Sequence, residues 1–80
     1  MMINAYILIA MQPGDYEKAV QSMRKIDNIA KISIVAGDFD IVVRAQVDDL
    51  EQLLQVTDKI QLIDGVRKTT TQVIEKELAI

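Results

Sequence analysis

The sequence predicts an α+β fold in which a four-stranded antiparallel sheet carries two helices on one face. Three observations support this prediction. Four short segments are rich in aliphatic and β-branched residues, as strands are. Two other segments carry apolar residues at helical spacing. The segments follow one another as strand, helix, strand, strand, helix and strand along 80 residues, so we expect a single domain covering residues 1–80.

The first predicted strand covers residues 3–11 and stops before Pro13 and Gly14. Its odd-numbered side chains from Ala5 to Met11 and its even-numbered side chains from Tyr6 to Ala10 are all apolar. Both faces of the strand are therefore apolar. A strand of this kind is typical of the interior of a sheet that is covered on both sides.

The next segment predicts an amphipathic helix, since one stripe of it is apolar. The stripe consists of Tyr16, Ala19, Val20, Met23 and Ile26. Acidic side chains in the first turn and basic ones in the last turn suit the helix dipole, and here these are Asp15, Glu17, Arg24 and Lys25. Asp27 and Asn28 form the predicted end of the helix, because Asn tolerates left-handed backbone geometry.

Residues 29–36 and 39–47 form a predicted hairpin around Gly37, which adopts positive φ without steric cost. The first of these strands has an apolar face made by Ala30, Ile32 and Ile34. The second has a fully apolar face beginning at Phe39 and an opposite, mixed face. A second sheet packed on the mixed face would explain its apolar residues.

The second predicted helix begins at Asp48, a good N-cap residue with Glu51 three positions later. Its apolar stripe consists of Leu50, Leu53, Leu54, Thr57 and Ile60. The last predicted strand covers residues 66–75, and alternation places the hydroxyls of Thr69 and Thr71 on the same face. The charges that follow it, including Glu77, are expected to be solvated.

This order of elements predicts the ferredoxin-like βαββαβ sandwich. Right-handed crossovers place the first and third strands in the centre of the sheet and the other two at its edges. The sheet face opposite the helices would be bare in a monomer. We therefore expect a homodimer that resembles an α/β barrel, formed by sheet-to-sheet packing through this face. Its predicted interface residues are Tyr6, Leu8, Val42 and Arg44.

Composition excludes several classes of function. The chain has no histidine and no cysteine, which removes imidazole and thiolate chemistry and most transition-metal sites. We therefore expect no catalytic residue, no metal and no cofactor. A net charge of −3 without a basic face argues against direct nucleic-acid binding. No apolar run is long enough to span a membrane and no signal peptide is recognisable, so we expect a cytoplasmic protein.

Local residues alone leave the role of the hairpin turn open. Gly37 and the acidic residues Asp38 and Asp40 suffice for an ordinary solvated turn, and two acids in one turn supply too few oxygens for calcium. Backbone N–H groups at Gly37 would also suit an anion. The hydroxyls of Thr69 and Thr71 fit a polar site, but threonine is also common in strands for its β propensity alone.

Three motifs together resemble the amino-acid-sensing RAM domain of the Lrp/AsnC family of transcriptional regulators. They are PGDYEKA after the first strand, GDFDIVVRAQ in the hairpin and IDGVRKTTTQVI near the end. Family members commonly have Pro-Gly where this chain has Asp27-Asn28, and Ile-Pro-Gly-Val where it has residues 63–66. Full-length members carry a winged helix-turn-helix before this domain, so the chain resembles a stand-alone member.

The resemblance implies an amino-acid effector bound between neighbouring dimers, which assemble into octamers or decamers. Since no DNA-reading element is recognisable in the sequence, we expect any effect on transcription to depend on co-assembly with full-length Lrp/AsnC regulators. The implied ligand-binding residues are Gly37, Phe39, Asp40, Thr69 and Thr71. Three alternatives stay open. They are an ACT-like amino-acid-binding domain with Gly14 at its site, a small ferredoxin-like enzyme, and a ring-forming structural protein without a ligand.

Overall fold

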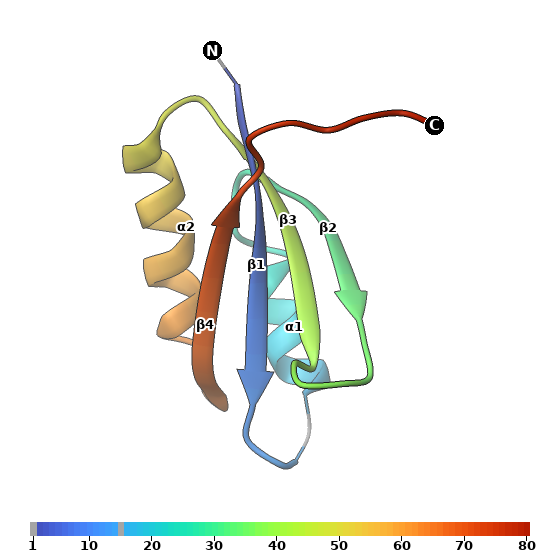
Figure 1. Ribbon diagram of the computed structural model, residues 1–80. Coiled ribbons are helices and arrows are strands. Elements are labelled where there is room, and N and C mark those ends of the chain that lie inside the picture. Colours follow the sequence, from blue (N-terminus) through green and yellow to red (C-terminus); the bar gives the residue numbers. More distant parts are fainter. Residues whose placement is uncertain (1, 15) are drawn as a thin grey trace.

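The predicted ferredoxin-like arrangement is confirmed by a computed structural model, which describes residues 2–14 and 16–80. The sheet has the order β2-β3-β1-β4 with antiparallel neighbours throughout. Both helices cover one of its faces (Figure 1). The elements are β1 (Ile3–Met11), α1 (Glu17–Met23), β2 (Ile29–Ile34), β3 (Ile41–Val47), α2 (Leu50–Gln61) and β4 (Val66–Val73). As predicted, β1 and β3 are central.

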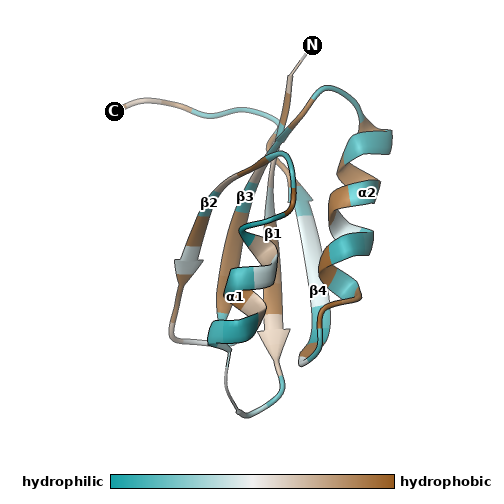
Figure 2. Ribbon diagram, turned by 180° about the vertical axis from the view of Figure 1, so that it is seen from behind, coloured by the Kyte–Doolittle hydropathy of each residue, from teal (hydrophilic) through white to brown (hydrophobic). Residues whose placement is uncertain are grey.

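The core lies between the helices and the inner face of the sheet, where odd-numbered residues of the two central strands meet. Ile7 is paired with Val43, and Ile9 with Ile41, and all four side chains are fully buried. Ala19 and Met23 of α1 close the core from the other side. In Figure 2, which views the molecule from the helix side, the central strands are largely brown and β4 is pale. The most hydrophobic strands are therefore the two central ones, and their inner-face residues form the core.

Strand β2 contains a register shift that its alternation does not reveal. Ile29 is paired with Ala45 and Lys31 with Arg44, so Ala30 is an extra residue at this bulge. Ile29 and Ile32 pack against the core, whereas Ala30 is exposed. Ile34, at the end of this edge strand, is half exposed. Of the three residues predicted for the apolar face of this strand, only Ile32 therefore packs against the core. Both hairpin strands are shorter than predicted. Strand β2 ends at residue 34 and not at 36, and β3 begins at residue 41 and not at 39.

Helix α1 is shorter than predicted. It ends at Met23, and Arg24 occupies the C-cap, so neither Arg24 nor Lys25 lies in the last helical turn. The Lys25 N–H donates to the Ser22 carbonyl (3.2 Å), a tight turn that leaves the α-helical path. Asn28 has φ of 74°, the left-handed conformation predicted for it, but it lies at the entry to β2 and is not the helix cap. The predicted role of Asp15 lies outside the described residues.

Helix α2 begins one residue later than predicted. Asp49, not Asp48, is the N-cap, and its carboxylate accepts from the Gln52 N–H (2.9 Å). The Gln52 side chain accepts in return from the Asp48 N–H (2.9 Å), so the reciprocal capping pair involves Gln52 and not Glu51.

The buried stripe of α2 also differs from the prediction. It consists of Leu53, Val56, Thr57 and Ile60. Leu50 and Leu54 are about 60 % exposed, at 62 % and 59 %. One residue corresponds to about 100° around a helix, so Leu54 turns to the side of the helix when Leu53 faces the sheet.

Strand β4 ends at Val73, two residues before the predicted end. Across the described residues, no helix has the length and apolar character needed to cross a membrane.

Candidate functional site

The loop between β2 and β3 is a closed hairpin connection, as predicted. The Val35 N–H donates to the Asp40 carbonyl (2.9 Å), which leaves residues 36–39 as the loop. Gly37 has φ of 150°, and a Cβ placed there would have no heavy atom within 4 Å. Glycine is therefore required by the backbone conformation and not by a close neighbour. The loop is open on the side of Gly37.

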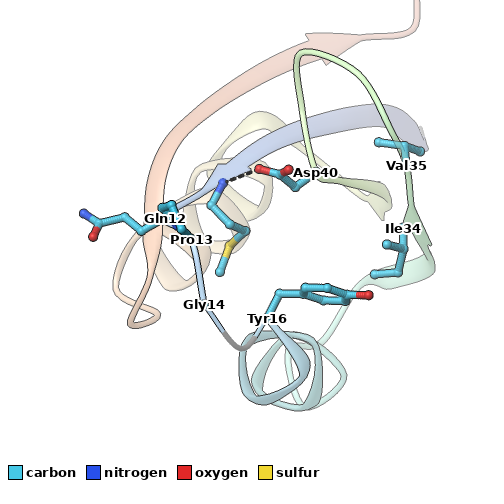
Figure 3. Close-up of a pocket in the computed structure, with 8 residues that line it drawn as sticks. Gln12, Pro13, Gly14, Tyr16, Ile34, Val35 and Asp40 are labelled. Atoms are coloured by element: carbon cyan, nitrogen blue, oxygen red, sulfur yellow. Dashed lines mark hydrogen bonds between the residues drawn. The ribbon is translucent and has the colours of Figure 1, made fainter.

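Asp40 joins three strands at the base of this loop. In addition to its carbonyl bond to β2, its N–H donates to the Ile9 carbonyl of β1 (2.9 Å). Its side-chain Oδ2 accepts from the Met11 N–H (2.8 Å), as Figure 3 shows. Because β3 begins only at residue 41, this carboxylate replaces the missing backbone partner of Met11. The second acidic residue of the hairpin motif thus holds the end of β1 against the loop.

A groove of about 380 Å³ lies beside Asp40 (Figure 3). The turn after β1 forms one wall and the end of β2 the other, and Tyr16 closes it near the start of α1. Its lining residues are Met11, Gln12, Pro13, Gly14, Tyr16, Ile34, Val35 and Asp40. Its volume lies near the lower end of the range of roughly 300–1,000 Å³ for small-molecule sites.

Among the described residues that line this groove, Asp40 supplies a carboxylate and Gln12 an amide, and the other walls are largely apolar or aromatic. A carboxylate has about four lone-pair positions, so Asp40 keeps acceptor capacity after it binds Met11. Ile34 and Tyr16 are about half exposed, at 51 % and 43 %, and offer apolar surface. The arrangement suits a small ligand with one cationic group and one apolar part. No group of three side chains suited to a metal ion occurs in residues 2–14 and 16–80.

The two predicted threonines lie elsewhere. Thr69 is paired with Ile9 and Thr71 with Ile7, so both belong to the helix side of the edge strand β4. The Gln61 side-chain amide at the end of α2 donates to the Thr69 hydroxyl (2.9 Å). Strand β1 lies between Thr69 and the base of the hairpin loop, because Ile9 is paired with Thr69 on one side and its carbonyl accepts from the Asp40 N–H on the other. One chain therefore brings Gly37, Phe39 and Asp40 together, but not with the threonine pair.

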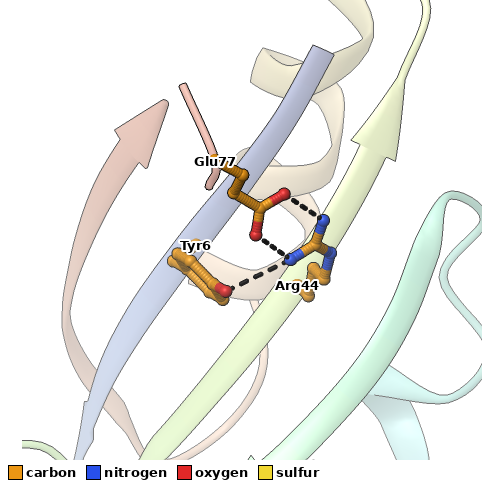
Figure 4. Close-up of polar contacts among 3 residues, drawn as sticks. All are labelled: Tyr6, Arg44 and Glu77. Carbon is orange, nitrogen blue, oxygen red and sulfur yellow. Dashed lines mark hydrogen bonds and ion pairs between the residues drawn. The ribbon is translucent and has the colours of Figure 1, made fainter. Parts of the chain in front are cut away.

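The face of the sheet opposite the helices carries the four side chains predicted for the dimer interface. Tyr6 is paired with Arg44 and Leu8 with Val42, so all four share this face. Arg44 donates two hydrogen bonds of 3.0 Å to the carboxylate of Glu77 and one of 3.1 Å to the Tyr6 hydroxyl (Figure 4). Its guanidinium carbon lies 5.6 Å from the centre of the Tyr6 ring.

Glu77 is exposed, as predicted, but it also makes a contact that the sequence does not indicate. The segment after β4 crosses in front of the central strands, and its first residue, Ile74, donates to the Asn4 carbonyl (2.8 Å). Glu77 is thereby brought to Arg44. The hydrogen bonds from Arg44 lower the pKa of Glu77, and the same pair raises the pKa of Arg44.

Sequence reasoning missed most of the groove and the partner of Arg44. The sequence connects Gly14 with a ligand only in the ACT-like alternative, and it places Tyr16 in a buried stripe, although Tyr16 is substantially exposed. A sequence signal existed in the hairpin motif, because an acidic residue immediately before a strand is suited to capping free N–H groups nearby. No local signal connects Glu77 with Arg44, which lies 33 positions away.

Comparison with protein families decides the relationship. Residues 4–79 match the family described as the Lrp/AsnC ligand binding domain. The chain belongs to this family. The resemblance drawn from its three motifs is thereby confirmed.

Individual relatives agree with this placement. The HTH-type transcriptional regulator FL11 of Pyrococcus furiosus is 31 % identical over 74 residues, which are 92 % of this chain and 49 % of FL11. The chain thus spans about half the length of the curated regulators it matches. A homocitrate synthase of Saccharolobus islandicus is 29 % identical over 95 % of this chain, but only 17 % of the enzyme is covered. Related domains therefore occur in proteins of different kinds.

Solved structures show the same fold. The protein TTHA0845 from Thermus thermophilus superposes with a TM-score of 0.88 at 24 % identity, covering 98 % of this chain and 99 % of that protein. The transcriptional regulator NMB0573 from Neisseria meningitidis, solved as a complex with L-Met, gives a TM-score of 0.86 at 20 % identity. The match covers 98 % of this chain and 53 % of the regulator.

Proposed function

We propose that this chain binds a free amino acid and acts as an effector-binding and oligomerisation domain in transcriptional regulation. The observation that carries the proposal is the match of residues 4–79 to the Lrp/AsnC ligand binding domain. The groove beside Asp40 supports it, because a carboxylate next to apolar walls suits an α-ammonium group and an apolar side chain. The L-Met bound to the Neisseria meningitidis regulator supports the ligand class.

In the proposed site, Asp40 accepts from the ammonium group of the ligand and the open loop at Gly37 and Phe39 offers backbone groups to its carboxylate. Thr69 and Thr71 contribute from a neighbouring copy. We assign them to a neighbouring copy because neither threonine lines the groove beside Asp40 in its own chain. In this proposal, a site with all five residues lies at a boundary between chains. Occupancy of that boundary would favour one assembly over another.

The proposed assembly is a homodimer formed through the open sheet face, followed by octamers or decamers. Tyr6, Leu8, Val42 and Arg44 form the proposed first interface. Co-assembly with full-length Lrp/AsnC regulators stays a prediction of the same proposal. Binding is proposed to occur without catalysis, in agreement with a chain that contains no histidine or cysteine.

Titration calorimetry with each of the twenty amino acids tests the binding proposal. At least one should bind at millimolar concentration or below, and Asp40→Ala should weaken its binding at least tenfold. Asp38→Ala is the matched control, because Asp38 is an exposed carboxylate of the same loop that does not line the groove. Absence of heat for all twenty amino acids would remove the effector proposal.

The ACT-like alternative keeps one specific observation in its favour, because Gly14 also lines the groove. The two proposals differ in the role of the second chain. Thr69→Val with Thr71→Val should weaken binding if the site spans a chain boundary. If this double substitution leaves affinity unchanged while Gly14→Ala abolishes it, the ligand lies in the groove of one chain and the ACT-like arrangement is favoured.

A further inference from the structure

The strands of the open sheet face carry only positive charge. Cross-strand pairing places Lys31 next to Arg44 on this face, and Lys68 opposite Ala10 at its other edge. No strand residue that shares this face is acidic. Two such faces packed about 10 Å apart would bring six cations together. At that distance, which is close to the Debye length in physiological salt, the repulsion is only partly screened.

The segment after β4, residues 74–80, supplies the missing negative charge. Glu77 binds Arg44 through both carboxylate oxygens, at 3.0 Å each. Arg44 projects from a central strand, where a paired sheet would remove its remaining contact with water. Leaving a charge buried without a partner is among the costliest changes at an interface. Glu77 provides this partner from the same chain.

The same segment carries exposed apolar side chains. Leu78, next to Glu77 in the chain, is 76 % exposed, and Ile80 is exposed as well. An exposed side chain beside a residue that is held on the open sheet face is available to a second sheet placed over that face. Figure 1 shows the segment crossing in front of β1 and β3 just after the end of β4.

We propose that residues 74–80 form a charged and apolar layer between two copies of this chain. Glu77 neutralises Arg44 of its own chain, and Leu78 contacts the open sheet face of the second copy. The inference rests on the proposed sheet-to-sheet dimer and adds the element that makes pairing of two cationic faces favourable. The opposite role for the segment, a cover that keeps the second copy away, is an outcome of the test.

Sedimentation velocity over a range of concentrations tests this role. Glu77→Gln and, separately, Leu78→Ser should each raise the dissociation constant of the dimer at least tenfold. Glu51→Gln is the matched control, since it removes the same charge from an exposed position on α2, in the helix layer. The exchange Arg44→Glu with Glu77→Arg should restore part of the affinity lost in Glu77→Gln, because it rebuilds an ion pair.

Three results would overturn the inference. Unchanged association of Glu77→Gln and Leu78→Ser would show that the segment takes no part in pairing. Tighter association of Glu77→Gln would show that the segment covers the face and competes with the second copy. A wild-type chain that stays monomeric at all concentrations would remove the sheet-to-sheet dimer and this inference together. Calorimetric amino-acid binding would still be measured independently, so the two failures are distinguishable.

Discussion

Replacing Asp40 by alanine tests the role assigned to the hairpin motif. The change removes the acceptor of the Met11 N–H and leaves the backbone bonds of residue 40 in place. Hydrogen bonds to charged groups contribute about 1.5–3 kcal/mol. Because Met11 is only half-buried, water can replace part of the lost bond, and we expect a loss of about 1–2 kcal/mol. For a domain of this size that corresponds to a decrease in Tm of roughly 4–16 °C.

Thermal unfolding followed by circular dichroism, at one fixed protein concentration, measures this decrease. The concentration must be fixed because self-association also stabilises the folded chain. Asp38→Ala serves as the control, since it removes an exposed carboxylate of the same loop and leaves the bond between Asp40 and Met11 intact. We expect a change within about 0.5 kcal/mol for this surface position. Equal destabilisation by the two substitutions would refute the specific role of Asp40.

Three further predictions follow from the structure. Asp49→Ala should cost about 1 kcal/mol of stability in urea unfolding, whereas Asp48→Ala should have a smaller effect, because only Asp49 caps α2. Leu53→Ala should cost about 2–5 kcal/mol and Leu54→Ala less than about 0.5 kcal/mol, since only Leu53 is buried. The carboxyl pKa of Glu77, followed by NMR, should lie below its ordinary value of 4.5. The ion pair should therefore be intact above pH 4.5 and lost as the pH falls through that lower pKa. A midpoint at or above 4.5 would contradict the ion pair.

The helix caps show why local patterns locate elements better than their ends. Asp48 and Asp49 are both suitable N-cap residues, and Glu51 and Gln52 are both suitable partners three positions after them. The pattern cannot decide between two registers that differ by one residue. The structure selects Asp49 with Gln52, because that register turns Leu53 and Val56 towards the sheet.

The candidate site shows a second limit of prediction from local sequence patterns. The hairpin and its glycine were predicted from residues 36–40 alone, because the requirement for positive φ is a property of one residue. The groove was not predicted, because its walls come from the turn after β1, from Tyr16 and from the end of β2. Thr69 and Thr71 do not line the groove, because the strand order places β4 on the other side of β1 from the hairpin.

The sequence by itself determined the order of the elements, the inner face of β1 and β3, and the hairpin, since alternation and turn residues act over a few neighbouring positions. Only the tertiary structure decided the bulge in β2, the bond between Asp40 and Met11, and the path of residues 74–80 across the sheet. The last two depend on contacts between residues 29 and 33 positions apart. All three depend on which strands become neighbours when the whole chain packs, and no local period encodes them.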